Sequence, residues 1–503
     1  MAKIDIHKNY RIGKIEKTLF GTFVEHMGRS IYGGIYDPQS KYSDEKGFRK
    51  DVVALVKELG VGVIRYPGGN FLSGYDWKDA IGPKEERKAR LDLAWFQTEP
   101  NTIGIHEFSE WAKEAGVEIM LGVNMGTGTP REAGEYVEYC NHPSGTYWSD
   151  KRAENGAKEP FSIEYWCVGN EMDGDWQICT KKAEEYGRIA HETAKIMKWV
   201  DPSLKLTVCG SSGSAMPTYP EWDRIVLEHT YNDIEYLSLH KYYEFPNWDK
   251  TRVSDFLASF VDFDAFIKTG KATIEYVKTY RRSKKQVYIS VDEWNVWHTN
   301  QGDCQTDKWS VGARRLENRY TALDAVVFSS LMLTLINNAD CVKVACLAQL
   351  VNVIAPIFVE QDKEAIKQTI FYPFSLGSKY AKGEAMRTLV DSEEYSSVWG
   401  SAPYLYSATA YDDETGELSV FLVNNREEKS EVTEMDFHGF GNLEAVETLV
   451  LDYKDKFDIN DFDARENVKM VQGEKAKETA NGSFSFTMPK LSFAVLRFKE
   501  KKQ

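Results

Sequence analysis

Two glutamates stand where apolar runs of the sequence stop. Glu171 ends the run "EYWCVGNE" (164 to 171), and Glu293 lies at the end of "QVYISVDEW" (286 to 294). A pair of carboxylates is the equipment for cleaving a glycosidic bond, because one is kept protonated to assist the leaving group while the other is ionised and attacks or activates water. This pairing indicates glycosidase chemistry.

Tryptophans accompany both glutamates and favour the same chemistry, because flat aromatic faces suit the C–H surfaces of sugars. They are Trp95, Trp176, Trp294 and Trp297. For any single tryptophan, packing in the core is the commoner role.

Other chemistries fit the sequence less well. "CGSSGS" (209 to 214) has its glycines one residue too close for the serine-hydrolase turn G-x-S-x-G. "YPGGNF" (66 to 71) matches no phosphate-binding pattern and instead predicts a tight turn that presents Asn70. The nine histidines show no metal-ligand spacing, so we expect neither metal nor cofactor. His26, His142 and His298 are interpreted as structural or substrate-facing.

The elements that would position these residues are short apolar strands alternating with amphipathic helices. Helical spacing is clearest in 48 to 59 and 105 to 115, which end at Gly60 and Gly116 as helix C-termini often do. Eight strands are expected at 18–26, 62–66, 118–124, 164–171, 205–212, 236–242, 286–294 and 342–350. Eight such units favour a (β/α)8 barrel over a doubly wound open sheet, although periodicity does not itself show closure.

From about residue 385 the pattern changes to a period of two, as in 417–425, 442–451 and 483–498. Such runs predict antiparallel strands of a β-sandwich, with the stretch 412–416 as a hairpin turn. The opening "KIDIHK" also alternates and is expected to pair with that sandwich. We therefore predict a catalytic barrel over 18–384 and a sandwich domain over 385–503, joined by the N-terminal strand within 1–17.

In a (β/α)8 barrel the active site lies at the C-terminal ends of the strands. All eight predicted strands end in groups that form hydrogen bonds. One polar strand end would mean little, but eight together favour an active site. The groups are Glu25, Arg65, Asn124, Asn170 with Glu171, Ser211, His240 with Tyr242, Glu293, and Gln349.

Composition excludes several partners. The formal charge of −15 and the lack of a long basic run argue against binding to nucleic acid or an anionic membrane. The seven cysteines include no CxxC pair and are interpreted as reduced core residues (140, 167, 179, 209, 304, 341 and 346). The start has no apolar segment of signal-peptide length, so we expect a cytoplasmic protein.

Six segments of the sequence resemble the α-L-arabinofuranosidases of glycoside hydrolase family 51. They are "GTFVEHMGRSIYGGIYDP" (21 to 38), "IRYPGGNFLSGYDWKDAIGP" (64 to 83), "WCVGNEMDGDWQ" (166 to 177), "LSLHKYY" (237 to 243), "DEWNVW" (292 to 297) and "ACLAQLVNVIAPI" (345 to 357). The resemblance runs in order through nearly the whole barrel. It weakens in 298–320 and in the sandwich.

The resemblance implies a retaining mechanism in which Glu171 is the general acid/base and Glu293 is the nucleophile, with their carboxyl groups about 5 to 5.5 Å apart. It also implies supporting roles for other residues. Glu25, Asn70 and Gln349 would bind furanose hydroxyls, Asn170 the 2-hydroxyl, and Tyr242 and Arg65 would contact the nucleophile, while Trp95 and Trp297 would wall the leaving-group side and His240 would support the site.

A site of this kind would be exo-acting and would trim arabinose from arabinofuranosyl-containing oligosaccharides derived from arabinan or arabinoxylan. The resemblance further suggests a homo-hexamer. The alternatives are a retaining endo-glucanase or β-xylosidase on the same scaffold, and a non-catalytic sugar-binding protein. The segments 126–160, 244–262 and 298–320 would shape the leaving-group side, and the sequence does not define their conformation.

Overall fold

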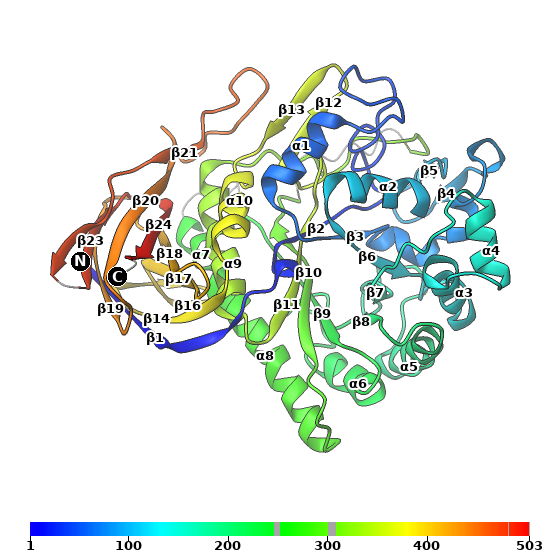
Figure 1. Ribbon diagram of the computed structural model, residues 1–503, viewed down its shortest axis with the longest axis horizontal. Coiled ribbons are helices and arrows are strands. Elements are labelled where there is room, and N and C mark those ends of the chain that lie inside the picture. Colours follow the sequence, from blue (N-terminus) through cyan, green and yellow to red (C-terminus); the bar gives the residue numbers. More distant parts are fainter. Residues whose placement is uncertain (246–251, 300–307, 481, 502–503) are drawn as a thin grey trace.

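Eight parallel strands form a closed barrel (Figure 1). The computed structural model describes residues 1–503 except 246–251, 300–307, 481 and 502–503. In order around the barrel the strands are β2 (Gly21–Phe23), β3 (Val63–Tyr66), β6 (Glu118–Val123), β7 (Tyr165–Val168), β8 (Lys205–Val208), β9 (Tyr236–Tyr243), β10 (Tyr288–Val296) and β11 (Val342–Ala348). Each of the eight predicted strands overlaps an observed one, so the predicted barrel is confirmed, although several observed strands are shorter than predicted.

Helices cover the outside of the barrel (Figure 1). The two predicted helices are confirmed as α1 (Lys50–Leu59) and α2 (Ile105–Ala115), and each ends at a glycine with a left-handed backbone, Gly60 with φ 74° and Gly116 with φ 75°. Because side chains rarely adopt this conformation, glycine is the favoured residue at both ends. The others are α3 (Pro130–Asn141), α4 (Tyr147–Glu154), α5 (Ala183–Val200), α6 (Glu221–Thr230), α7 (Val253–Leu257), α8 (Ser259–Tyr280), α9 (Ala322–Asn337) and α10 (Phe371–Tyr380).

The second domain is built on one ten-stranded sheet. Its order is β21 (Lys469–Gln472), β20 (Leu443–Asp452), β24 (Ser492–Glu500), β18 (Glu417–Asn424), β17 (Leu405–Asp412), β14 (Glu384–Asp391), β1 (Ala2–Lys14), β19 (Glu431–His438), β23 (Ser483–Met488) and β22 (Lys477–Ala480). β1 pairs antiparallel with β14 and parallel with β19, so the predicted pairing of the N-terminal strand is confirmed, with one parallel pair in an otherwise antiparallel sheet.

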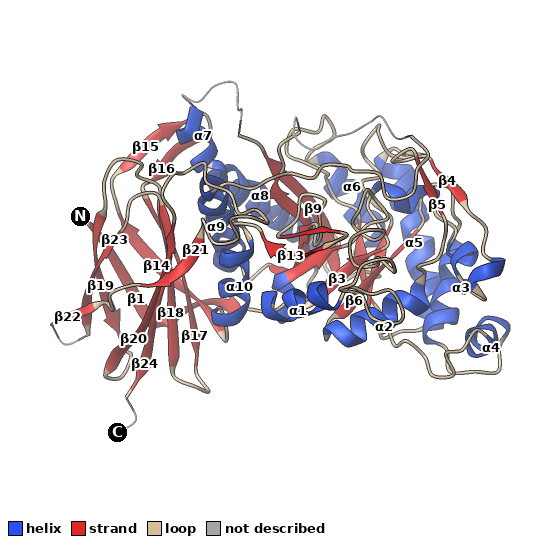
Figure 2. Ribbon diagram, turned by 90° about the horizontal axis from the view of Figure 1, so that it is seen from above, coloured by secondary structure: helices blue, strands red, loops and turns tan. Residues whose placement is uncertain are grey.

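The ten-stranded sheet folds over on itself and encloses its own core. Phe437 on β19 and Phe484 on β23 lie 4.9 and 5.0 Å from the ring of Phe498 on β24, although several strands separate β19 from β24 in the sheet. The predicted turn at 412–416 joins β17 to β18. Helix α9 is buried on nearly every side because it packs between β10 of the barrel and β17 and β18 of the sheet (Figure 2).

The described chain also contains three short hairpins: β4 (Arg90–Asp92) with β5 (Gln97–Glu99), β12 (Ile357–Glu360) with β13 (Lys363–Lys367), and β15 (Glu394–Ser397) with β16 (Gly400–Pro403). No described helix has both the length and the apolar character needed to span a membrane. Five of the predicted core cysteines are buried and free, but Cys179 is exposed, so the core interpretation is wrong for that residue. Cys304 lies outside the described residues.

Candidate active site

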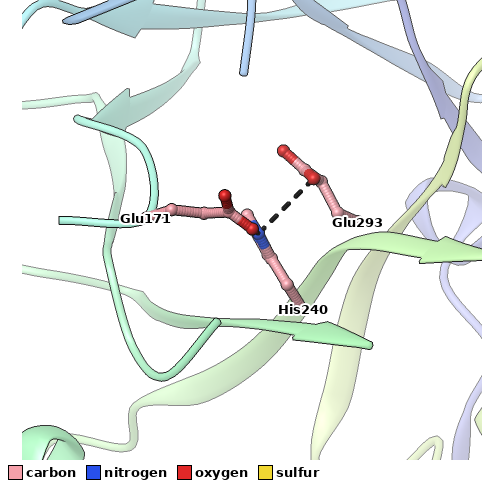
Figure 3. Close-up of side chains that lie close together, drawn as sticks. All are labelled: Glu171, His240 and Glu293. Atoms are coloured by element: carbon pink, nitrogen blue, oxygen red, sulfur yellow. Dashed lines mark hydrogen bonds and ion pairs between the residues drawn. The ribbon is translucent and has the colours of Figure 1, made fainter. Parts of the chain in front are cut away.

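The two predicted catalytic glutamates face each other at the C-terminal end of the barrel, with His240 of β9 close to both (Figure 3). The His240 Nδ1 atom lies 2.9 Å from Glu171 Oε1 and 3.5 Å from Glu293 Oε2. One carboxylate oxygen of each glutamate and this nitrogen all fall within 4.8 Å of one another. The structure therefore brings together residues that are 122 positions apart in the sequence.

Backbone geometry explains how Glu171 reaches this position. β7 ends at Val168, and Gly169 follows with φ 91°, a conformation that side chains rarely adopt. A Cβ atom on Gly169 would also approach the Cβ of Met125 to 2.9 Å. Glu171 itself has φ 44°, so the chain turns sharply as it leaves the strand. Glu293, by contrast, lies within β10.

Glu293 is held by two donors. Its Oε1 accepts a hydrogen bond from Arg65 Nη1 at 2.6 Å, and its Oε2 accepts one from the Tyr242 hydroxyl at 2.7 Å. Arg65 also donates through Nη2 to Asn170 Oδ1 at 2.6 Å, and its Nε lies 3.3 Å from Asp292. Because Arg65 is buried and carries a full charge, it stabilises the ionised form of the carboxylates around it.

Glu171 lies in a different electrostatic setting. Burial, reinforced by the charge of Glu293, raises its pKa above the ordinary value, while hydrogen bonds from His240 and Trp176 oppose the rise. Burial alone would lower the pKa of His240, but Glu293, Asp292 and Glu171 raise it to about 10. A protonatable carboxyl beside a carboxylate held by a cation is the arrangement that general acid catalysis with a nucleophile requires.

Among the described residues, Glu171, His240 and Glu293 form the one cluster whose atoms are close enough to ligate a metal ion. A metal ligand must be a neutral imidazole, whereas His240 lies among three carboxylates that favour its protonated form. Its ring nitrogens face Glu171 and Asp292 as donors would. The donor set thus fits proton transfer better than metal binding.

A cavity of about 500 Å³ opens directly above the glutamates. Its walls contain the predicted residues Glu25, Asn70, Trp95, Glu171, Tyr242, Glu293, Trp297 and Gln349, together with Phe23, Met27, Gly69, Trp176, Ser212, Leu316 and Ile354. The predicted residues Arg65, Asn170 and His240 are buried behind these walls and contact the glutamates or one another.

Glu25 is a buried carboxylate in the cavity wall. Its Oε1 accepts hydrogen bonds from Phe71 N at 3.0 Å and Trp95 Nε1 at 2.8 Å, and its Oε2 accepts one from Gln349 Nε2 at 3.2 Å. Burial raises the pKa of Glu25 to about 8 although the first two hydrogen bonds oppose this. A Cβ on Gly69 would lie 2.4 Å from the Glu25 carboxylate, which explains a glycine just before Asn70.

Several candidates lie outside the cavity walls. The side chain of Asn124 caps its own loop by accepting from Gly126 N at 2.9 Å, and Ser211 bonds to buried Asp223. Trp294 stacks on Phe328 in the core. His26 and His298 pair with Glu99 and Asp324, respectively, as structural residues do, and His142 follows the end of α3. A polar residue at a strand end therefore does not by itself locate the site.

The sequence did not identify Asp292 as part of the site, and it placed Trp176 beside the glutamates without indicating what its N–H contacts. Asp292 is buried within hydrogen-bonding or ion-pairing reach of Arg65, His240 and Ser238, and Trp176 donates through Nε1 to Glu171 Oε2 at 2.7 Å. The sequence did contain a signal for Asp292, because Asp292 and Glu293 are adjacent within an apolar strand. A carboxylate buried in such a strand needs a charged partner, which places Asp292 in the same charged cluster as Glu293. No sequence signal distinguishes the N–H contact of Trp176 from packing.

Known proteins match this chain throughout. A family model described as "Alpha-L-arabinofuranosidase 1 domain" matches residues 55–252, and one described as "Alpha-L-arabinofuranosidase C-terminal domain" matches 292–492. An intracellular exo-α-(1→5)-L-arabinofuranosidase 1 of Bacillus subtilis (strain 168) is 48% identical over 99% of both chains. The solved structure of a family 51 α-L-arabinofuranosidase from Bifidobacterium longum superposes with a TM-score of 0.94 at 39% identity, over 99% of both chains.

The chain belongs to the glycoside hydrolase family 51 α-L-arabinofuranosidases. A second relative from B. longum is an exo-α-(1→6)-L-arabinofuranosidase. It is 44% identical to the present chain, and the match covers 99% of the present chain and 97% of the relative. The family and the glycoside hydrolase class expected from the six sequence segments are thus confirmed.

Proposed function

We propose that this arabinofuranosidase acts from the non-reducing end and releases terminal α-L-arabinofuranosyl residues by retaining double displacement, with Glu171 as general acid/base and Glu293 as nucleophile. The approach of their oxygens to within 4.8 Å carries this proposal. Retaining enzymes place the two carboxyl groups about 5 to 5.5 Å apart, whereas inverting enzymes leave about 6.5 to 9.5 Å for a water molecule.

In the first step Glu171 gives its proton to the glycosidic oxygen while the bond from that oxygen to the anomeric carbon breaks. Glu293 attacks the same carbon and forms an ester. In the second step water, losing a proton to the ionised Glu171, displaces Glu293 and yields arabinose of unchanged configuration. The raised pKa of Glu171 suits the first step, and the donors on Glu293 suit its ionised form.

The charge of the buried cluster supports this assignment. In the reactive state that we propose, Glu171 carries the proton and is neutral, while the cations Arg65 and His240 balance the anions Asp292 and Glu293. After the first step Glu293 is esterified and Glu171 has lost its proton, so the sum is unchanged. Because a net buried charge is costly, a cluster that stays neutral lowers the barrier to forming the intermediate.

The cavity walls suit a single terminal sugar. Glu25, Asn70 and Gln349 would bind the furanose hydroxyls, and Asn170, held by Arg65, would bind the 2-hydroxyl. Trp95 and Trp297 would form walls on the leaving-group side. A site that pairs each hydroxyl rejects sugars that leave its buried donors and acceptors unpaired, which favours exo action.

The substrates we propose are oligosaccharides derived from arabinan or arabinoxylan, cleaved in the cytoplasm. Relatives named intracellular exo-arabinofuranosidases support the location. Their printed linkages differ, α-(1→5) in B. subtilis and α-(1→6) in one B. longum protein, so linkage preference is a property to measure. We further propose a homo-hexamer, and a division into a barrel over 18–384 and a sandwich over 385–503 completed by 1–17.

Substrate selectivity tests the activity. The enzyme should turn over an aryl α-L-arabinofuranoside far faster than the corresponding aryl β-xyloside or a β-glucan. Faster turnover of β-glucan or β-xyloside would favour the endo-glucanase or β-xylosidase alternative and contradict the specificity.

The residue roles are tested with Glu171→Ala. This variant should keep part of its activity on an aryl substrate whose leaving group needs little protonation, and lose between about 10²- and 10⁴-fold on an oligosaccharide. Added azide should restore turnover and give an arabinofuranosyl azide of retained configuration, identified by NMR. An azide of inverted configuration would instead assign Glu171 as the nucleophile.

A further inference from the structure

The two oxygens of the Glu171 carboxyl have different partners. Oε1 faces His240 Nδ1 at 2.9 Å, and His240 is buried within β9 with its other ring nitrogen 3.6 Å from Asp292. Oε2 accepts the Trp176 Nε1 hydrogen at 2.7 Å, and Trp176 is 49% exposed. One partner is therefore fixed in the core and the other lies at the surface.

Trp176 lies where the cavity meets solvent. It forms part of the cavity wall together with Glu171 and Ser212, yet half of its surface faces solvent. Because His240 engages Oε1 from the core, Oε2 is the oxygen that is left to pass a proton to a glycosidic oxygen in the cavity. The indole N–H is a donor only, so it occupies a lone pair of the oxygen that the reaction uses.

The indole of Trp176 packs on its own loop and not in the hydrophobic core. A Cβ atom on Gly174 would lie 2.4 Å from the Trp176 ring, so the ring rests directly on the glycine. Moving a ring that is already half exposed loses little buried apolar area. A sugar stacking at the cavity mouth could offset that loss with its own contact.

We propose that Trp176 is a positioning residue for the acid/base: its indole N–H holds Glu171 Oε2 in the empty site and yields that oxygen to the glycosidic oxygen when a leaving-group sugar enters. The proposal rests on the proposed role of Glu171 and deepens it. No bond beyond those of the two displacement steps forms or breaks, because the indole keeps its hydrogen throughout.

The exchange of partners would match each step to the protonation state it needs. A donor on Oε2 stabilises the ionised carboxylate and so lowers the pKa of Glu171. With the sugar present and the indole displaced, the pKa rises and the acid is protonated. Once the leaving group departs with the proton, Glu171 is ionised, and the returning indole stabilises this ionised form until water enters to be deprotonated.

Other charged and titratable groups face Glu171 as well, and they stay constant in the test. They are His240 and Tyr242 from β9 and Glu293 from β10, with Arg65 from β3 behind Glu293. A change confined to the indole therefore reports on the N–H donor alone.

The experiment measures pH profiles of Trp176→Phe on an α-L-arabinofuranosyl disaccharide, whose poor leaving group makes the first step rate-limiting. The basic limb of kcat/KM reflects Glu171 in the free enzyme, and that of kcat reflects the substrate complex. Losing the donor should raise the pKa in the free enzyme, so the kcat/KM limb should move up by about one pH unit. The kcat limb should stay in place, because the indole is already displaced there.

Gly174→Ala provides a second variant if Trp176→Phe folds poorly, because it keeps the indole and pushes it off the loop. It should produce the same shift of the kcat/KM limb. The matched control is Trp199→Phe, which removes a 77% exposed tryptophan on α5 and should move neither limb.

An unchanged kcat/KM limb in a folded variant, or limbs of kcat and kcat/KM that move together, would overturn the proposal. Azide rescue of Glu171→Ala separates this failure from failure of the proposed function. Rescue without a limb shift in Trp176→Phe contradicts the role of Trp176 only, whereas absence of rescue contradicts the acid/base assignment on which it rests.

Discussion

The regions around the two glutamates that we propose as catalytic are built differently. Glu293 lies within a strand and receives both of its hydrogen bonds from buried or half-buried groups, Arg65 and Tyr242. Glu171 lies on a turn after its strand and takes one of its two contacts from the exposed Trp176. The region of the proposed nucleophile is closed and fixed, and the region of the proposed acid/base opens toward solvent.

This difference follows from what each residue must do. A nucleophile needs one protonation state and one position, which buried partners provide by holding it in place. An acid/base must change its protonation state within each cycle and exchange protons with a leaving group and with water. A partner at the surface permits that exchange, whereas a second buried cation would oppose it.

The largest effect should come from Glu293→Ala. Without the nucleophile no covalent intermediate forms, so activity on both aryl and oligosaccharide substrates should fall by more than about 10⁴-fold, beyond the range of general acid–base catalysis. Steady-state assays on both substrates would measure this. The comparison with Glu171→Ala is the control, and a Glu293→Ala enzyme that kept normal activity on the aryl substrate would reverse the two assignments.

Arg65→Met should have the next largest effect. It removes one of the two cations that face the buried carboxylates of Asp292 and Glu293, and leaves His240 alone to balance both negative charges. Breaking a buried pair in this way costs about 3 to 5 kcal/mol of stability. Urea denaturation would measure the loss.

A matched control is available on the surface. Arg131→Met breaks an exposed helical pair with Glu135, in which the arginine is 87% exposed, and should cost less than about 1 kcal/mol. If Arg65→Met were no more destabilising than Arg131→Met, the buried ion pairs would not hold Glu293 in place, and the proposed contrast with the region around Glu171 would fail.

The sequence predicted the barrel well because its strands are buried on both faces and therefore read as continuous apolar runs. Eight strands, two helix ends and the turn at 412–416 all depend on local patterns of this kind. The two glutamates proposed as catalytic could be picked out in the sequence for the same reason, since each interrupts an apolar run. The parallel pairing of β1 with β19 was not, because it joins segments more than 400 residues apart.

Side-chain partners were the harder part of the site. Asn124 and Ser211 stand at strand ends as Asn170 does, yet they hold loops rather than line the cavity. The direction of a side chain beyond a strand depends on how the following loop folds. For the same reason the sequence placed Trp176 near the site without indicating the contact of its N–H with Glu171.

The smallest of these effects should come from Tyr242→Phe. This variant removes the hydroxyl that donates a hydrogen bond to Glu293 Oε2, 2.7 Å away. A hydrogen bond to a charged group is worth about 1.5 to 3 kcal/mol, so kcat/KM should fall between about 10- and 150-fold. Tyr243→Phe is the matched control, because its hydroxyl bonds to Asp262 instead and its loss should leave activity near that of the wild type.

Tyr242→Phe also sharpens the contrast with Trp176→Phe, since each variant removes one donor from one glutamate. The Tyr242 contact lies inside the site and persists when substrate binds, so kcat should fall together with kcat/KM. The Trp176 contact is exchanged on binding, so its loss should alter the pH limb of kcat/KM alone. If Tyr242→Phe left kcat unchanged, its hydroxyl too would be a displaceable partner, and the distinction between a fixed and an exchangeable region would fail.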